Sequence, residues 1–410
     1  MLCGQSINMK KKILYLALDF PNIEKSNNLY TDLMEEFRDN DHEVFVVAPS
    51  SEVLKTELRN ESGMQVLRVK TLPLLNVNVV KKGIANLLLP KRFLKAINVF
   101  YKNIDFDVII LPTPPITLYT VVQSLKKKRK IPVYLILRDI FPQNAIDLGM
   151  ISKKGAIYKY FRRLEKKLYN ISDMIGCMSQ GNIDYILQHN NDVDASKLHI
   201  LRNWQKNQDF SSIDKNEIKL KFNLENKFVI FFGGNIGKPQ KVENIVSLAN
   251  SFKHNKNVIF YIIGKGTEKD KLIKLVENNK LVNVIIKDFL PRNEYIEMMQ
   301  IADVGLVSLD EKFTIPNMPS KALSYFNVRI PVIALIDENT DFGTWVENEV
   351  KAGYWVSAKD PSLLVEKIEY LIENPGQRNI IGENGYNYFV KHLNPTVAYK
   401  IIINSLKDVV

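Results

Sequence analysis

The stretch TIPNMPSKALSYFNVRIPVIALI, residues Thr314–Ile336, has the pattern of a loop, a short helix and a buried strand in succession. Pro319 and Ser320 stand where the helix should begin, because serine caps helices and proline is tolerated near their first turn. Pro331 ends the helix before the apolar run that follows it. The unpaired N–H groups of a helix start attract anions, and Lys321 adds a positive charge there. The stretch therefore predicts a phosphate site, although an ordinary loop–helix–strand unit with a surface lysine has the same pattern.

A second candidate phosphate loop precedes it in the chain. The apolar run Phe228–Phe232 is followed at once by GGNIG, Gly233–Gly237. Glycines let backbone amides approach a ligand and permit positive φ. Lys238 and Lys241 follow closely enough to neutralise two phosphates. The alternative is a plain glycine turn between a strand and a helix, which is common in α/β folds.

Buried strands alternate with amphipathic helices along the whole chain, which predicts two doubly wound α/β domains of the Rossmann-like kind. Gln205–Asn216 is polar and carries no period, so it is the expected interdomain linker. We expect domains over 9–205 and 206–390, and a C-terminal helix within 391–410 that packs back toward the first domain. The expected strands cover 11–18, 43–48, 107–111, 132–137, 174–178 and 198–201, and then 228–232, 258–263, 284–287, 304–309, 332–336 and 353–356.

Two polar loops follow buried strands in the first half. One contains Asn27 and Asn28, and the other begins with Arg138 and Asp139. Binding loops of open parallel sheets lie at the carboxyl ends of the strands. Arg138 could meet a phosphate and Asp139 could orient or deprotonate a substrate hydroxyl, while a turn or helix cap is the alternative for Asp139. No Gly-x-Gly-x-x-Gly follows the first strand, so a dinucleotide site is not expected.

The segment KKGIANLLLPKRFLKAINVFYK, Lys81–Lys102, mixes basic residues with a row of large apolar ones. On a helix interrupted near Pro90, an apolar face would lie beside a basic one, which suits an anionic membrane surface. A core helix with solvated lysines explains the segment equally well. The net charge of +11 implies an anionic partner. Nucleic acid is not expected, because the basic residues are spread over many helices without a recognition module.

The composition is that of an ordinary globular protein, with 46% hydrophobic and 25% charged residues over 410 positions. Two cysteines, Cys3 and Cys177, cannot build a disulfide framework, and no Cys or His spacing suggests a metal site. No apolar run approaches the ~20 residues that cross a bilayer. These features favour a reduced, cytoplasmic setting.

Several motifs resemble the GT-B glycosyltransferases, specifically the retaining family 4. The motifs of the second half are FVIFFGGNIGKPQK (228–241), IIGKGTEKDKL (262–272), ADVGLVSL (302–309) and PSKALSYFNVRIPVIA (319–334). In the first half, RDIFPQNAIDLG (138–149) and ILRNW (200–204) are similar to the branch that includes the N-acetylfucosamine transferases of bacterial O-antigen and capsule assembly. The resemblance covers nearly the whole chain.

The resemblance implies a cleft between the domains, a nucleotide-sugar donor held mainly by the second domain, an acceptor held mainly by the first, and no required metal or other cofactor. Lys238 or Lys241 would balance the charge of the donor diphosphate, and Asp139 would be the catalytic group on the acceptor side, near Arg138, Asn27 and Asn28. The remaining donor-binding candidates, carried over by position, are Gly234, Asn235, Gly237, Asp288, Phe289, Pro319, Ser320, Lys321 and Ser324.

One departure from the family pattern concerns two acidic residues that commonly stand eight positions apart in this region. Pro316 and Ser324 occupy the matching positions here. In the family, the second acidic residue holds the ribose hydroxyls of the nucleotide. The Ser324 hydroxyl can still hydrogen-bond a ribose, but it offers less than a carboxylate that accepts two bonds.

These residues lead to the hypothesis of a retaining transferase that moves a sugar, an N-acetylated deoxyhexosamine, from a UDP-sugar to a polyprenyl-diphosphate-linked acceptor at the inner face of a bacterial membrane. A non-catalytic GT-B scaffold of a glycan assembly complex is the alternative from another class. A sugar-nucleotide 2-epimerase is less favoured, because the five histidines sit at strand edges or on polar helices.

Overall fold

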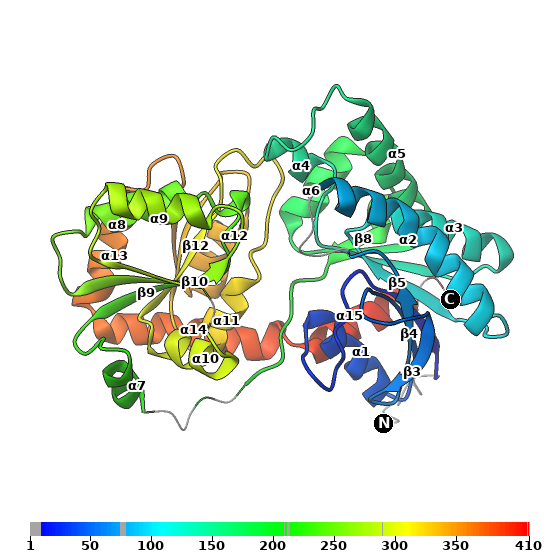
Figure 1. Ribbon diagram of the computed structural model, residues 1–410, viewed down its shortest axis with the longest axis horizontal. Helices are drawn as coiled ribbons and strands as arrows, with labels where there is room; N and C mark the ends of the chain where they lie inside the picture. Colours follow the sequence, from blue (N-terminus) through cyan, green and yellow to red (C-terminus); the bar gives the residue numbers. More distant parts are fainter. Residues whose placement is uncertain are drawn as a thin grey trace, which may run out of the picture. The chain divides into compact units, whose positions relative to one another are not determined.

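The computed structural model describes residues 10–73, 79–208, 210, 214–288, 290–407 and 409. The chain divides into two compact units, each built on its own sheet with helices packed against it (Figure 1). Unit 1 takes in Met1–Ile146, Ile151–Arg202 and Pro395–Val410, and unit 2 takes in Asp147–Met150 and Asn203–Asn394. Among the described residues, no helix is both long and apolar enough to cross a membrane.

The sheet of unit 1 has the strand order β3-β4-β2-β1-β5-β6-β7-β8 in the described part of the chain. All neighbouring strands are parallel except β3 and β4. Helices cover both faces of such a sheet, so its central strands are continuous apolar runs. The strands are β1 (Lys12–Leu16), β2 (Glu43–Ser50), β3 (Glu57–Glu61), β4 (Met64–Lys70), β5 (Val108–Pro112), β6 (Val133–Leu137), β7 (Met174–Cys177) and β8 (Leu198–Ile200).

The antiparallel pair β3–β4 was not among the strands predicted from the sequence. Its two strands join at Ser62 and Gly63, whose φ angles are 49° and 79°. Two successive residues with positive φ make the tight turn that matches the twist of a hairpin. The Ser-Gly dipeptide is the sequence signal that could have revealed this pair.

The helices of unit 1 include one from the far end of the chain. On α15, Tyr399 packs its ring edge-on against Phe37 of α1 at 5.0 Å between centroids, and its hydroxyl lies 2.9 Å from Nε2 of His42. Figure 1 shows α15, in red, beside the blue α1. The helices are α1 (Leu29–Asp39), α2 (Val79–Phe100), η1 (Ile116–Leu118), α3 (Tyr119–Lys128), α4 (Gln143–Asp147), α5 (Ala156–Ile171), α6 (Gln180–His189), η2 (Ala195–Lys197) and α15 (Pro395–Leu406).

Helix α2 runs through Pro90 without a break, so the expected interruption is wrong. A proline inside a helix has no N–H for the carbonyl four residues earlier, which is that of Asn86. Here the hydroxyl of Thr117 donates to that carbonyl at 3.2 Å. A side chain from η1 therefore supplies the hydrogen bond that Pro90 cannot make.

The sheet of unit 2 has the order β11-β10-β9-β12-β13-β14 in the described residues, and every neighbouring pair is parallel. Its core includes Phe232, Phe260 and Leu306 from the sheet, with Leu248 of α8 and Leu272 of α9. The strands are β9 (Phe228–Asn235), β10 (Val258–Lys265), β11 (Val284–Lys287), β12 (Val304–Ser308), β13 (Val332–Ile336) and β14 (Gly353–Ser357). Together with unit 1, this sheet confirms the expected pair of doubly wound α/β domains.

The helices of unit 2 connect these strands and then close the unit after β14. They are α7 (Lys215–Lys221), η3 (Lys238–Gln240), α8 (Val242–Ser251), α9 (Lys269–Asn278), α10 (Arg292–Ile301), α11 (Lys321–Asn327), α12 (Phe342–Thr344), the π-helix η4 (Trp345–Val350), α13 (Leu363–Glu373) and α14 (Pro375–His392).

The start of the expected linker is bonded to unit 2. The backbone N–H of Gln205 donates to Leu393 at 2.9 Å, and Asn207 donates from its side chain to the hydroxyl of Tyr386 at 3.3 Å. The rest of the expected linker includes 209 and 211–213, which lie outside the described residues.

Candidate functional site

The glycine loop of unit 2 forms at the carboxyl end of β9, as expected for a parallel sheet. Gly234 has φ of 107°, a conformation that side chains rarely adopt. Gly264 pairs with Gly234 so closely that a Cβ on Gly264 would lie 1.9 Å from the Gly234 carbonyl oxygen. The N–H of Ile236 then donates to the backbone carbonyl of Lys265 at 2.9 Å, and this bond joins the ends of β9 and β10. These contacts hold the loop in one shape and leave Gly234 and Asn235 exposed.

The N–H of Gly237, a candidate for the diphosphate, is already bonded. It donates to Oε1 of Gln240 at 3.1 Å, and the same oxygen accepts from Nδ2 of Asn235 at 3.3 Å. Gln240 lies at the end of η3, one turn after the loop. A ligand would have to displace the Gln240 side chain to reach the Gly237 amide. This role of Gln240 was missed, and a glutamine three residues after a glycine start is its only sequence signal.

The two lysines after the loop differ in their partners. Lys241 forms an ion pair with Glu311, which follows β12. Burial raises the pKa of Glu311, but the hydrogen bond and charge of Lys241 together with further hydrogen bonds outweigh burial and hold this pKa below its usual range. Lys238 is exposed and has no ion pair within the described part of the chain. Of the two lysines, Lys238 is therefore the one whose charge is available to a diphosphate without breaking another contact.

The helix start predicted near Pro319 and Ser320 lies at the same edge of the sheet. Helix α11 begins at Lys321, and the Ser320 side chain makes no capping hydrogen bond. Lys321 does not extend into solvent as a surface lysine would. Its Nζ lies 3.6 Å from the centre of the Phe232 ring, is enclosed, and has no hydrogen-bond acceptor among the described residues. Burial lowers the pKa of Lys321 to about 7, so the full positive charge predicted for this position is wrong at neutral pH.

The contact of Lys321 with Phe232 brings the two candidate phosphate loops together. Phe232 is the residue before Gly233, so the start of α11 meets the end of β9. The cluster Gly234, Asn235, Lys238 and Lys321 is called the β9–α11 site below. Backbone amides, an exposed ammonium and an enclosed amine at one edge of a sheet are suited to an anion.

The loop before α11 is tied to the turn after β13. The N–H of Asn317 donates to Oγ1 of Thr340 at 3.1 Å, and the Thr340 hydroxyl donates to Asp337 at 2.8 Å. Asp337 is buried, and burial raises its pKa to about 6 even though hydrogen bonds from Thr340 and Asn339 lower it. Asp337 thus positions the loop that contains Pro316 and Pro319. Asp337 was not among the predicted site residues, although its place directly after a buried strand is a usable signal.

The hydroxyl of Ser324 donates to Oε1 of Gln205 at 3.0 Å. Nearby, Nδ2 of Asn203 donates to the carbonyl of Met318 at 2.9 Å. The segment after β8 therefore runs along α11 and its preceding loop. Ser324 has a partner within unit 2, so a ribose would compete with Gln205 for this hydroxyl.

The third expected donor element follows β11. Asp288 is exposed and forms an ion pair with Lys269, whose hydrogen bond and charge lower the pKa of Asp288. Phe289, the other residue expected to border the nucleobase, lies outside the described residues.

In unit 1, the segment after β6 meets the segment after β5. The hydroxyl of Thr113 accepts from the N–H of Arg138 at 3.1 Å and donates to the carbonyl of Asp139 at 3.1 Å. The Asp139 side chain is exposed and makes no hydrogen bond in the part of the chain that the structure describes, so the turn-cap alternative for Asp139 is wrong. Asp139 is free to accept a proton or a hydrogen bond from a substrate.

The Arg138 guanidinium points into unit 1. It hydrogen-bonds the hydroxyl of Tyr30, and burial lowers its pKa while the neighbouring Tyr15 and Tyr134 raise it. The hydrogen bond from Arg138 to Tyr30 connects the segment after β6 to α1. Tyr30, near the start of α1, was missed because nothing in its local sequence marks it.

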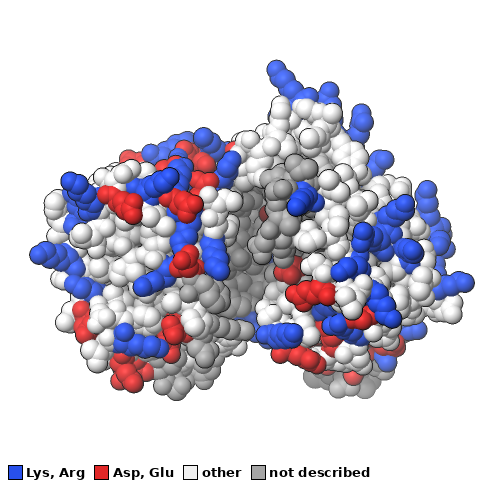
Figure 2. Space-filling view, in the orientation of Figure 1, with Lys and Arg blue, Asp and Glu red and all other residues white. Residues whose placement is uncertain are grey.

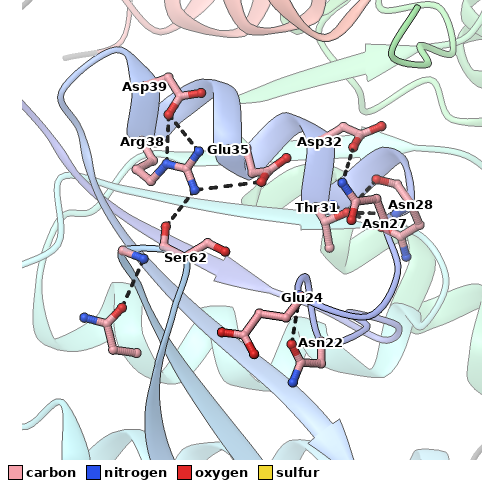
Figure 3. Close-up of polar contacts among 12 residues, drawn as sticks. Asn22, Glu24, Asn27, Asn28, Thr31, Asp32, Glu35, Arg38, Asp39 and Ser62 are labelled. Carbon is pink, nitrogen blue, oxygen red and sulfur yellow. Dashed lines mark hydrogen bonds and ion pairs between the residues drawn. The ribbon is translucent and has the colours of Figure 1, made fainter. Parts of the chain in front are cut away.

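The two asparagines expected on the acceptor side lie at the start of α1 (Figure 3). Oδ1 of Asn28 accepts from the N–H groups of Tyr30 at 2.9 Å and Thr31 at 3.0 Å, and the N–H of Asn28 donates to Oγ1 of Thr31 at 2.8 Å. This is a capping box, which satisfies the free N–H groups of the helix start. Nδ2 of Asn27 lies 3.5 Å from Oδ1 of Asp32. Asn28 therefore stabilises the helix start. Its Nδ2 lies 3.4 Å from Oδ2 of Asp19, whose carboxylate is exposed.

Two family models match the chain, one in each half. The model described as Glycosyltransferase Family 4 matches residues 27–204, and the one described as Glycosyl transferases group 1 matches residues 214–388. With the two doubly wound units, these matches make the chain a GT-B glycosyltransferase whose first half is of the family 4 type and whose second half is of the group 1 type.

Among known proteins, the chain is similar to the probable glycosyltransferase WbjE of Pseudomonas aeruginosa, with 24% identity over 72% of this chain and 73% of the relative. It is also similar to the putative colanic acid biosynthesis glycosyl transferase WcaI of Escherichia coli, with 22% identity over 61% of this chain and 62% of that protein. HepE of Anabaena, solved with UDP and glucose, has the same fold at a TM-score of 0.69, with 14% identity over 97% of this chain and all of its own (100%).

Proposed function

We propose that the chain is a retaining glycosyltransferase of surface polysaccharide synthesis, such as O-antigen or capsule assembly. It transfers a sugar, an N-acetylated deoxyhexosamine, from a UDP-sugar to a saccharide carried on a polyprenyl diphosphate. The family matches support glycosyl transfer, and the names of WcaI and WbjE support a glycan product. The acceptor would be met at the cytoplasmic face of the bacterial membrane, through the region Lys81–Lys102.

The main support for a nucleotide-sugar donor at the β9–α11 site is the contact between Lys321 and Phe232. It gathers exposed backbone of Gly234, the ammonium of Lys238 and an enclosed amine at one strand edge. HepE, which shares the fold, was solved with UDP, and this supports a uridine nucleotide here. In this proposal, Asp288 and Phe289 border the base, and Ser324 turns from Gln205 to the ribose.

The chemistry follows from charge. As the bond between the anomeric carbon and the diphosphate oxygen breaks, negative charge builds on the leaving diphosphate, and groups already in place stabilise it best. Lys238 supplies a fixed positive charge, and Lys321 takes up a proton as the anion enters. The hydroxyl of the acceptor attacks from the face that the diphosphate leaves, and it passes its proton to Asp139. The new bond keeps the anomeric configuration of the donor, and no metal ion takes part.

The test is a reaction of the purified protein with a panel of UDP-sugars and a polyprenyl-diphosphate acceptor. We expect one UDP-sugar to be consumed, and nuclear magnetic resonance of the product to show the donor's anomeric configuration. UDP binding is measured in parallel by calorimetry. If there is neither product nor UDP binding, the proposal fails, and an inverted anomer would reject the retaining course.

The alternative is a GT-B scaffold that binds a partner without transferring sugar. The ion pair between Lys241 and Glu311 favours it, because one expected diphosphate ligand is already neutralised. An experiment in the source organism distinguishes the scaffold from the transferase. If Lys238→Ala and Asp139→Ala leave polysaccharide production unchanged while deletion of the chain abolishes it, the scaffold is correct.

A further inference from the structure

Helices α2 and α5 of unit 1 border an open groove. Both helices pack on η1. The groove has a volume of about 270 Å³. Its walls are mainly apolar, and they include Leu87 and Leu94 of α2, Tyr160 and Leu164 of α5, and Thr117 and Thr120 below.

The apolar surface continues outside the groove. On α2, Ile84, Leu87 and Leu88 are 49%, 52% and 40% exposed, and on α5, Ile157 and Tyr160 are 60% and 47% exposed. Leu87 and Tyr160 line the groove, which therefore connects the exposed apolar residues of the two helices. Contiguous exposed apolar surface on a protein marks a place of contact with a partner or a membrane.

The charges around the groove are almost all positive. Helix α2 contains no Asp or Glu, and α5 contains one, Glu165, which is buried and paired with Arg162. The exposed basic residues on and beside the two helices include Lys81, Lys91, Lys95, Lys102, Lys153, Lys154, Lys159, Arg163, Lys166 and Lys167. Figure 2 shows blue side chains over the area that α2, α3 and α5 occupy in Figure 1, with few red ones among them.

We propose that the α2–α5 groove is a lipid-docking site that takes one acyl chain of an anionic bilayer lipid while the surrounding lysines bind the headgroups. The inference deepens the membrane contact named in the proposed function and rests on it. It extends that contact from Lys81–Lys102 to α5.

The choice of a bilayer lipid rests on shape and charge together. Clefts that hold drug-sized ligands measure about 300–1,000 Å³, so this groove has room for part of a single acyl chain. Its exposed apolar rims, with Ile157 and Leu88 outside the walls, would meet neighbouring lipid chains once the first is seated. Long basic side chains can bury their stems in apolar surface and place their charges among anionic headgroups. Lys91, which lines the groove, is placed for this.

The first experiment asks whether an acyl chain reaches the groove. Tyr160→Trp places a tryptophan in the wall, and the emission of this variant is compared with that of the unmodified chain, whose native tryptophans all lie in unit 2. Vesicles of equimolar phosphatidylcholine and phosphatidylglycerol carry bromine on their acyl chains, which quenches nearby tryptophan. We expect quenching of the added emission with these vesicles and little with pure phosphatidylcholine. Vesicle binding without this quenching would overturn the acyl-chain claim.

The second experiment separates the apolar contact from the charges by vesicle co-sedimentation. Leu87→Glu with Tyr160→Glu should weaken binding at least tenfold, and Val282→Glu, at an exposed site of unit 2, is the matched control. Lys91→Glu with Arg163→Glu should weaken binding to anionic vesicles about fivefold per residue, with Lys253→Glu and Lys256→Glu as the control pair. Unchanged binding in both groove variants, or no binding by the unmodified chain, would overturn the proposal.

A prenyl chain of the acceptor is the competing occupant. If farnesyl phosphate in free solution alters the Tyr160→Trp emission while brominated vesicles do not, the groove holds substrate and the bilayer-lipid proposal is wrong. UDP binding by calorimetry is measured on the same preparations. Groove variants should keep it, so a failure of vesicle docking is distinguishable from a failure of the proposed transferase, in which UDP binding itself is lost.

Discussion

The Nζ of Lys321 lies 3.6 Å from the centre of the Phe232 ring, with no hydrogen-bond acceptor among the described residues. The aromatic face offers a partial negative charge, but much less than water or a carboxylate would. The helix start and the glycine loop therefore meet through an amine that is half neutral near pH 7. An anion that reaches this edge would supply the partner that Lys321 lacks.

Binding of UDP should be linked to proton uptake through Lys321. Burial lowers its pKa to about 7, and an incoming diphosphate favours the charged form and so raises that pKa. Affinity should therefore fall as pH rises above 7. Calorimetry at pH 8 in two buffers of different ionisation enthalpy should give different binding enthalpies for the unmodified chain. Lys321→Met should remove the difference and Lys256→Met should keep it. Equal enthalpies in the unmodified chain would contradict the prediction.

Lys321 should also make the free energy of unfolding depend on pH, but with the opposite sign: UDP affinity falls as pH rises above 7, and stability rises. Between pH 7 and the ordinary lysine range, the unfolded chain holds a proton that the folded chain lacks, so the free energy of unfolding rises with pH in this window. Thermal melts at pH 7 and pH 9 should show that Lys321→Met gains stability relative to the unmodified chain at pH 7, and less at pH 9. A constant offset between the two proteins would argue against an enclosed amine.

Lys238 and Lys241 should contribute differently to donor binding. Lys238→Ala removes an available charge and should weaken UDP binding about tenfold. Glu311→Gln should instead tighten it, because the change frees Lys241 and removes a carboxylate that repels the diphosphate. Calorimetry measures both, and raised salt should reduce both effects because the groups are only partly buried. Weaker binding in Glu311→Gln would show that the ion pair holds Lys241 in its working position.

Asp337 should make stability depend on pH near 6. Burial raises its folded pKa to about 6, whereas the unfolded chain has the ordinary Asp pKa. The free energy of unfolding therefore falls as pH rises from the ordinary Asp range through 6, because the folded chain has to ionise a buried carboxyl. Asp337→Asn cannot ionise. The difference in melting temperature, variant minus unmodified chain, should therefore be larger at pH 7.5 than at pH 5. A difference that shrinks as pH rises would reverse the sign and contradict the assigned burial.

Thr117 should be needed because of Pro90. Thr117→Val removes the hydroxyl that donates to the Asn86 carbonyl, at a cost of about 1 kcal/mol in the free energy of unfolding. In a Pro90→Ala background the helix can make that bond with its own N–H, so the same change should cost less. Denaturant unfolding of the four proteins in this double-mutant cycle measures the coupling. Equal costs in the two backgrounds would show that Thr117 does not replace the missing N–H.

Local sequence was sufficient where a feature depends on neighbours along the chain. Apolar runs and their spacing predicted the alternating strands and helices, because the two periods follow from backbone geometry. The glycines after β9 predicted a loop that needs positive φ, and Gly234 has it. The hairpin β3–β4 also has a local signal, the dipeptide Ser62–Gly63, so its absence from the predicted strands is not a limit of the sequence.

The properties that decide the chemistry depend on residues far apart in the sequence, and only the tertiary structure supplied them. Lys241 and Lys238 are three positions apart and look alike in the sequence, but the fold places Glu311 against Lys241. Lys321 has the sequence pattern of a surface charge, but folding buries its amine, and burial lowers its pKa to about 7. The sequence alone determined which segments become strands, loops and helices. The fold decided which side chains are charged and available, because charge depends on solvation and on partners that folding brings together.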